Sequence, residues 1–264
     1  LAWFTTNKTA KATYNNIKAV SSTEKIRMEI GSVTESGKGS VSNYDPDTGN
    51  WKNEVQYVGS ASMVSDISSS DGKTLVKPIW TAQPGGTGTN FNKIRNAAPT
   101  EYTKFWIGIR NDGTNAAKVF LNSETLISAR ADKENDKALS KWSRAAVIDC
   151  GTSETKPDSF KEGNTICVFE NEDAETEKDK YVSNEVSDTA GKITLGTVDT
   201  NKHVIGSFPS IQEGTTELTN PKAYLGNFAQ GDTKTHYYVV TVWLEGTESN
   251  NQDAAIDASI NVTL

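Results

Sequence analysis

The sequence is short of apolar residues and has no long hydrophobic run. Apolar residues make up 35% of the 264 residues, and no stretch approaches the roughly 20 consecutive apolar residues that a membrane helix needs. Threonine, serine, asparagine, glycine and lysine take their place, a mixture typical of β-proteins with long polar loops. We therefore expect a β-protein whose mature form has no membrane partner.

Basic residues are outnumbered by acidic ones. The chain has 27 lysines and arginines against 34 aspartates and glutamates, which gives a formal net charge of −7. A nucleic-acid-binding protein shows a basic face or a cluster of lysine and arginine, and no such cluster occurs here. We therefore expect no nucleic acid among the partners.

Residues with catalytic potential are scarce. The only histidines are His203 and His236, and there is neither a His-Glu-x-x-His nor a Cys-x-x-Cys pattern, whereas a catalytic zinc typically needs three protein ligands. A Gly-x-Ser-x-Gly nucleophile motif is also missing. The sequence therefore predicts no catalytic residue and no enzyme activity, and a secreted hydrolase is the least favoured class.

Calcium is the one cofactor with any support, and that support is weak. Asp45 and Asp47 place two oxygen ligands two residues apart, as a calcium loop does. Gly49 and Gln56 break the EF-hand register, however. A hairpin turn explains the same Asp-Pro-Asp-x-Gly-Asn stretch equally well, so we expect no other cofactor and leave both interpretations open.

Two cysteines, Cys150 and Cys167, each lie in strand-like sequence. An even number of cysteines in a secreted chain favours a disulfide. A bridge across a loop of this length would contribute about 3 kcal/mol. We predict a Cys150–Cys167 disulfide, with two buried free thiols as the alternative.

The strongest strand pattern spans residues 236–244. Alternation puts one set of side chains on one face (Tyr238, Val240, Val242, Leu244) and a second set on the other (Tyr237, Val239, Thr241, Trp243). Both sets are largely apolar, which predicts a central strand buried on both faces.

Other strands are predicted at short intervals, separated by turn clusters. Their ranges are 25–30, 54–58, 75–80, 103–110, 118–121, 145–149, 165–170, 192–195, 204–208 and 256–264. Long polar loops are expected at 60–73, 151–163 and 171–191, and one short helix within 128–142. The fold class predicted is all-β, an antiparallel jelly-roll-like sandwich with long loops.

Tryptophan gives a second functional alternative. We assign Trp80, Trp106 and Trp243 to the core, because they lie within strand patterns. Trp51 and Trp142 have no such place. A monomeric surface adhesin or carbohydrate-binding module, using the loops around Trp51 and residues 85–90, is therefore an alternative function.

The N-terminus suggests export. The chain begins with Leu1 instead of methionine, and Leu1-Ala2-Trp3-Phe4 is abruptly apolar. Such a start resembles what signal-peptide cleavage leaves behind. We therefore expect a secreted protein, extracellular or at the cell surface, with an artificial chain boundary as the alternative.

Short motifs resemble one family. The run Leu1–Asn7 resembles the mature N-termini of the TasA/camelysin-like secreted proteins of Firmicutes, and Val242–Glu248 and Arg144–Ile148 are similar to strands of related proteins. The resemblance covers about a tenth of the chain. It implies a jelly-roll-like sandwich at the cell surface, in which the N-terminal segment of one subunit completes the sheet of the next. The metalloprotease activity ascribed to some members is not carried over, because no zinc motif is present.

The residues themselves are compatible with such assembly. We predict an assembly segment at residues 1–20, with Leu1, Ala2, Trp3 and Phe4 as the donor strand, and one sandwich domain at 21–264. An apolar terminus gains hydrogen bonds and burial at a partner's sheet edge, and head-to-tail contacts build an open filament. The function predicted is a structural subunit of an extracellular fibre or pilus-like filament of a biofilm matrix. Its partner is a second copy of itself, with glycan or other matrix components as further candidates. Folding back of Leu1–Phe4 within its own domain is the alternative.

Overall fold

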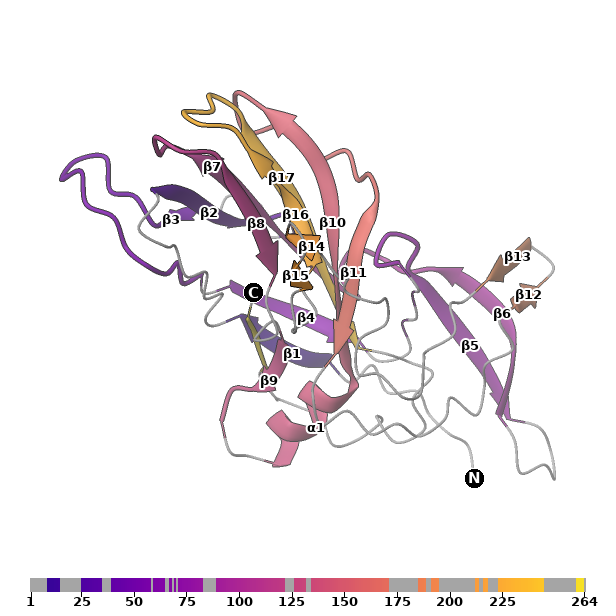
Figure 1. Ribbon diagram of the computed structural model, residues 1–264. Helices are drawn as coiled ribbons and strands as arrows, with labels where there is room; N and C mark the ends of the chain where they lie inside the picture. Colours follow the sequence, from indigo (N-terminus) through magenta and orange to yellow (C-terminus); the bar gives the residue numbers. More distant parts are fainter. Residues whose placement is uncertain are drawn as a thin grey trace.

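The protein is described by a computed structural model (Figure 1). The backbone is described for residues 9–14, 25–34, 39–57, 59–64, 67, 69, 71–82, 89–121, 126–131, 134–170, 185–188, 191–194, 212–213, 216–217, 223–244 and 260–263.

A six-stranded antiparallel sheet is the largest element. Its strand order is β11-β10-β17-β7-β2-β3, and in Figure 1 its strands fan out across the upper half of the molecule. The strands are β2 (Ile26–Ser32), β3 (Val41–Ser42), β7 (Thr103–Asn111), β10 (Ser143–Ser153), β11 (Thr165–Glu170) and β17 (Thr235–Leu244).

The other strands form antiparallel pairs. Three pairs are β1 (Thr9–Tyr14) with β4 (Gly59–Val64), β8 (Ala117–Leu121) with β16 (Ala223–Phe228), and β9 (Leu126–Ala129) with β18 (Ile260–Thr263). Three more are β5 (Val76–Ala82) with β6 (Thr89–Asn96), β12 (Glu185–Asp188) with β13 (Gly191–Thr194), and β14 (Gln212–Glu213) with β15 (Thr216–Glu217).

Strand β17 organises the core, as its aromatic and β-branched composition predicts. It pairs with β7 on one side and β10 on the other. The face that carries Tyr238, Val240, Val242 and Leu244 packs in the main core, and the predicted opposite set packs against the outer clusters. The division of β17 into two buried faces is confirmed.

The main core lies between the inner face of the six-stranded sheet and a second layer. That layer supplies Leu121 of β8, Ile127 of β9, Phe228 of β16 and Val262 of β18, all at most 5% exposed. Two layers of strands around one apolar core define a sandwich. The predicted all-β antiparallel sandwich is confirmed, and its jelly-roll form stays a prediction.

One short helix, α1 (Glu134–Trp142), leads directly into β10. Acidic residues lie in its first turn, where they suit the positive end of the helix dipole. The buried Asp136 accepts a hydrogen bond from the Ala131 amide at 3.1 Å, and Leu139 is fully buried. The helix expected within 128–142 is confirmed.

Several predicted boundaries need correction. Residues 54–57 form no strand, although Val55 and Tyr57 are buried in the main core. Residues 60–64 and 185–188, both predicted as loop, belong to the strands β4 (Gly59–Val64) and β12 (Glu185–Asp188). Six other strands were not predicted: β3, β6, β9, β14, β15 and β16. The range 204–208 lies outside the described residues.

Candidate functional site

The outer face of the six-stranded sheet carries an aromatic cluster, which we call the aromatic layer. Trp106 of β7 and Tyr237 of β17 are 3% and 4% exposed, and their rings lie 5.9 Å apart. Each ring lies over a glycine of the neighbouring strand, because Gly31 is the register partner of Trp106 and Gly108 that of Tyr237. A Cβ on Gly31 would come within 2.6 Å of the Trp106 indole, and one on Gly108 within 3.2 Å of Tyr237.

A loop lies over this layer. We call residues 154–164, between β10 and β11, the strap. Its Phe160 ring lies 5.9 Å from Trp106, close to parallel, and 5.7 Å from Tyr237. The Lys156 ammonium lies 5.8 Å from the centre of the Trp106 ring, within the range of a cation–π interaction.

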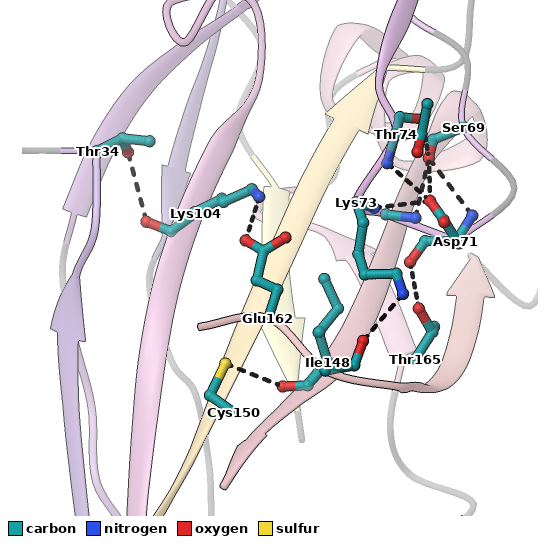
Figure 2. Close-up of polar contacts among 12 residues, drawn as sticks. Thr34, Ser69, Asp71, Lys73, Thr74, Lys104, Ile148, Cys150, Glu162 and Thr165 are labelled. Carbon is teal, nitrogen blue, oxygen red and sulfur yellow. Dashed lines mark hydrogen bonds and ion pairs between the residues drawn. The ribbon is translucent and has the colours of Figure 1, made fainter. Parts of the chain in front are cut away.

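Polar contacts hold the far end of the strap. Glu162 forms an ion pair with Lys104 of β7 (Figure 2), and both side chains are largely buried. The Gly163 amide donates to the Asp149 carbonyl at 2.7 Å. A Cβ on Gly163 would lie 2.9 Å from that oxygen, so the close approach requires glycine.

A tight turn, formed by Ser69 and residues 71–74, covers the neighbouring part of the outer face (Figure 2). The Asp71 carboxylate accepts from the Lys73 and Thr74 amides, each at 2.8 Å. Gly72 has a φ of +72°, and a Cβ there would lie 2.2 Å from the Ala146 Cβ. The backbone of this turn therefore sits directly on β10.

The turn and the strap region are joined. The Lys73 ammonium donates to the Gly163 carbonyl at 2.9 Å, and the Thr165 hydroxyl donates to the Asp71 carbonyl at 2.7 Å. Figure 2 shows the Thr165–Asp71 bond close to the Lys73 side chain. The outer face is thus closed by two covering segments that share hydrogen bonds.

The predicted disulfide is wrong, and both cysteines are free. Cys167 is paired in register with Val147 and lies in the main core, whereas Cys150 packs against the outer aromatic layer. Because side chains alternate between the two faces of a strand, the two sulfurs lie on opposite sides of the sheet. The interpretation as two free thiols holds, although only Cys167 is fully buried.

Burial changes the chemistry of both thiols. Desolvation raises the pKa of Cys167 to about 12 and, with a smaller contribution from the charges of Glu162 and Asp149, that of Cys150 to about 11. A thiol reacts as its thiolate. Neither cysteine therefore has the low pKa of a catalytic nucleophile.

One histidine has a carboxylate partner. His236 Nε2 lies 2.8 Å from the Asp149 Oδ1, and the ring stacks on Tyr238 at 4.7 Å. Its Nδ1 faces Gly226 of β16. Nucleophilic catalysis needs a hydroxyl or thiol within hydrogen-bond reach of the imidazole, and the contacts recorded for His236 in the described residues include none. The other histidine, His203, lies outside the described residues.

A second aromatic group lies beside β2. The Arg27 guanidinium is 4.3 Å from the centre of the Tyr44 ring, and Tyr44 packs against Trp51 at 4.7 Å. Arg27 and Arg110 both bind Asp112, at 2.7 and 2.6 Å, and hydrogen bonding to Asp112 raises the pKa of Arg110. Tyr44 and Trp51 are half-buried, but Arg27 already covers one face of Tyr44.

The calcium candidates form a turn. Asp45 Oδ1 accepts from the Asp47 amide at 3.0 Å, and its Oδ2 accepts from the Thr48 hydroxyl at 2.7 Å. These hydrogen bonds lower the pKa of Asp45. Gly49 supplies the positive φ, 69°, that closes the turn. Among the described residues, no group of three metal-binding side chains is found.

The predicted assembly segment, residues 1–20, is described only in part. Leu1, Ala2, Trp3 and Phe4 lie outside the described residues, so the donor strand stays a prediction. The later part of the 1–20 segment forms β1, which pairs antiparallel with β4 of the same chain from Thr9↔Val64 to Tyr14↔Gly59. Residues 9–14 therefore fold back within the chain.

Two of the three tryptophans assigned to the core are confirmed there. Trp106 and Trp243 are buried, at 3% and 0% exposure. The side chains of Trp80 and Trp142 lie outside what the structure describes, as do residues 83–88 of the second loop proposed for binding. Residues 89–90 begin β6.

Sequence reasoning missed the residues that shape the outer face: Gly31, Gly72, Gly108 and Phe160. A signal was present for two of them, because Gly31 and Gly108 are isolated glycines inside apolar strand patterns, which often mark a close approach. Phe160 stands alone in a polar loop and gave no periodic signal.

Comparison with known proteins identifies no relative. No family model matches the chain, and neither a curated protein sequence nor a solved structure is similar to it. Within the described residues, the structure has no helix that is both long and apolar enough to span a membrane.

Proposed function

We propose that this protein is a structural subunit of an extracellular fibre or pilus-like filament, in which the N-terminal segment of one copy completes the fold of the next. The protein would be secreted, have itself as its main partner, need no cofactor and have no enzyme activity. The apolar start of the chain and the all-β antiparallel fold support this proposal.

The pairing of β1 with β4 is the observation that carries the proposal. Six residues of the N-terminal segment form a continuous antiparallel ladder with β4, and β1 is bonded to no other strand in the described part of the chain. A two-stranded ribbon is marginally stable by itself. An identical element can be exchanged between copies at low cost, because every contact is preserved. The β1 strand of a neighbouring copy could therefore form the same ladder.

Exchange would give a filament instead of a closed dimer when it runs in one direction. Each copy would offer β1 at one surface and accept a β1 strand along β4 at another, and such head-to-tail contacts between unlike surfaces propagate. The apolar residues Leu1, Trp3 and Phe4 precede β1, and their burial at the junction would add to the stability of each joint.

Crosslinking distinguishes exchange from folding back. Ala12 of β1 and Ala61 of β4 are register partners, and the spacing of directly opposed antiparallel residues fits a disulfide. In a chain with Cys150 and Cys167 replaced by alanine, Ala12→Cys with Ala61→Cys should give covalent ladders of oligomers on oxidation. The matched control carries Ala12→Cys alone and should give at most dimers.

Microscopy tests the filament itself. The chain should form filaments in negative stain, whereas a variant lacking residues 1–12 and a Trp3→Ser/Phe4→Ser variant, which keeps all of β1, should stay folded and monomeric by circular dichroism and light scattering. If wild-type chains remain monomers in every condition and the cysteine pair closes only within one chain, the protein is no filament subunit.

One observation favours a second function. The half-buried Tyr44–Trp51 pair is an aromatic surface, and aromatic rings of this kind stack on sugars. A surface adhesin or carbohydrate-binding module would show a change in Trp51 fluorescence on titration with oligosaccharides, lost in Trp51→Ala. No response in the wild type would remove this alternative.

A further inference from the structure

The strap is held differently from the strands that it joins. Of its residues 154–164, only Phe160, Glu162 and Pro157 are partly buried, and the rest are exposed. In the described structure its backbone bonds are confined to one end, where Gly163 and Asn164 pair with Asp149. Residues 154–162 are attached through side chains, chiefly Phe160 and Glu162.

The two ends of the strap are anchored more firmly. Before it, Thr152 and Ser153 of β10 pair with β17. After it, Lys73 and Thr165 make hydrogen bonds to Gly163 and Asp71. Segments with exposed backbone and few buried contacts open locally at a lower free energy than the whole protein. The middle of the strap is such a segment, between two fixed points.

Opening of the strap would expose the aromatic rings and the thiol beneath it. Trp106 lies against Gly31 and Tyr237 against Gly108, and Phe160 of the strap packs on both rings. Cys150 packs against the same layer, and the charges of Lys104 and Glu162 act on its thiol. Lifting Phe160 would uncover the aromatic layer and widen access to Cys150.

We propose that residues 154–162 act as a strap that opens and closes over the Trp106–Tyr237 layer while the sheet stays folded, with the Lys104–Glu162 ion pair as its latch. This device is independent of filament formation. The open form presents the aromatic surface and a more accessible thiol, whereas the closed form covers the rings and leaves the Cys150 thiol half-buried.

Two reporters follow the strap in the native protein. Trypsin needs an extended segment of backbone, so cleavage after the exposed Lys161 should speed up when the strap leaves the sheet, and a disulfide reagent such as DTNB reports access to Cys150. Cys167, buried in the main core, reports global unfolding and serves as the internal control.

Loosening either contact should raise both rates below the onset of global unfolding. We expect Phe160→Ala to speed cleavage after Lys161 and modification of Cys150 roughly three- to tenfold, the loss of an aromatic pair. Glu162→Gln should speed them roughly two- to fivefold. The matched control, Asp158→Asn, changes a charge on an exposed strap residue and should leave both rates unchanged.

The dependence on salt distinguishes loss of the Lys104–Glu162 ion pair from a general loosening of the strap. Screening weakens an ion pair, so added NaCl should speed opening in the wild type and have little effect in Glu162→Gln. Opening rates that are equal in wild type, Phe160→Ala and Glu162→Gln would overturn the proposal. So would cleavage that occurs only when Cys167 also reacts, because the strap would then be a fixed part of the fold.

Discussion

The inner face of the six-stranded sheet is covered by other strands, whereas its outer face is covered by a turn and a loop. Inside, strands β8, β9, β16 and β18 supply apolar side chains to one continuous core. Outside, the covering segments are fixed by hydrogen bonds, an ion pair and close approaches at glycine. The same sheet is therefore buried by packing on one side and by specific local contacts on the other.

This difference determines how each face tolerates change. Apolar packing depends on volume, which can be shared among many neighbours. A covering turn seated on a glycine depends on a single atom-to-atom distance, as between Gly72 and Ala146. The inner face should therefore show large, graded costs of mutation, and the outer face abrupt costs at a few positions.

The largest effect is expected on the inner face. Phe105 is 2% exposed in the main core, and Phe105→Ala should lower the free energy of unfolding by about 3–5 kcal/mol, because it removes buried area and leaves a cavity. Urea denaturation followed by fluorescence measures this. Val33→Ala, at a 41% exposed position, should change stability by less than about 0.5 kcal/mol. Equal costs at the two positions would contradict the proposed division of roles.

The next effect isolates close approach on the outer face. Gly72→Ala should cost about 2–4 kcal/mol, from a positive φ and a clash with Ala146. Gly49 has a similar φ, +69°, but open space around its Cβ position, so Gly49→Ala should cost only about 1–2 kcal/mol. Adding Ala146→Gly to Gly72→Ala should recover part of the difference between them. A Gly72→Ala variant no less stable than Gly49→Ala would show that the turn does not sit on β10.

The last effect is absent at neutral pH and appears only at alkaline pH. Burial raises the pKa of Cys167 from 9.0 to about 12, so the folded state keeps a proton that the unfolded chain releases. The stabilisation is complete below pH 9 and is lost as pH rises towards 12, by about 1.4 kcal/mol for each pH unit.

Cysteine variants test whether the Cys167 thiol causes this loss of stability. In Cys167→Ala the decline in unfolding free energy above pH 9 should be shallower than in the wild type, whatever its stability at pH 7. The Cys150 thiol has a pKa of about 11, closer to its ordinary value. Cys150→Ala should therefore remove a pH-dependent loss of unfolding free energy that spans a narrower pH range than that of Cys167. Parallel stability curves for wild type and Cys167→Ala would contradict the burial of this thiol.

The sequence predicted the inner face better than the outer one. The alternation in β17 determines which of its residues share a face, because successive side chains of a strand point to opposite sides of the sheet. The covering of the outer face depends on contacts across long stretches of chain, such as Phe160 on Trp106. No local pattern contains that information.

The cysteines also show that local sequence does not determine contacts between distant parts of the chain. Strand-like sequence around Cys150 and Cys167 was recognised correctly, but a disulfide also requires both side chains on the same face. The register shift between Val147 and Ile148 and the pairing of Cys167 with Val147 decide this question, and both depend on the partner strand. Asp45, in contrast, formed the turn that its local sequence allows, because an Asx-type turn is closed within a few residues.

The position of β17 in the chain has a consequence for folding. Its partners β7 and β10 precede it by more than about 120 and 80 residues, so the central ladder of the sheet closes over long loops, which makes folding slow. A growing chain, synthesised at about 5–20 residues per second, contains every other strand of the six-stranded sheet before it contains β17. The six-stranded sheet cannot be completed before residues 235–244 have been synthesised, so its two parts, β3–β2–β7 and β10–β11, stay unjoined until then.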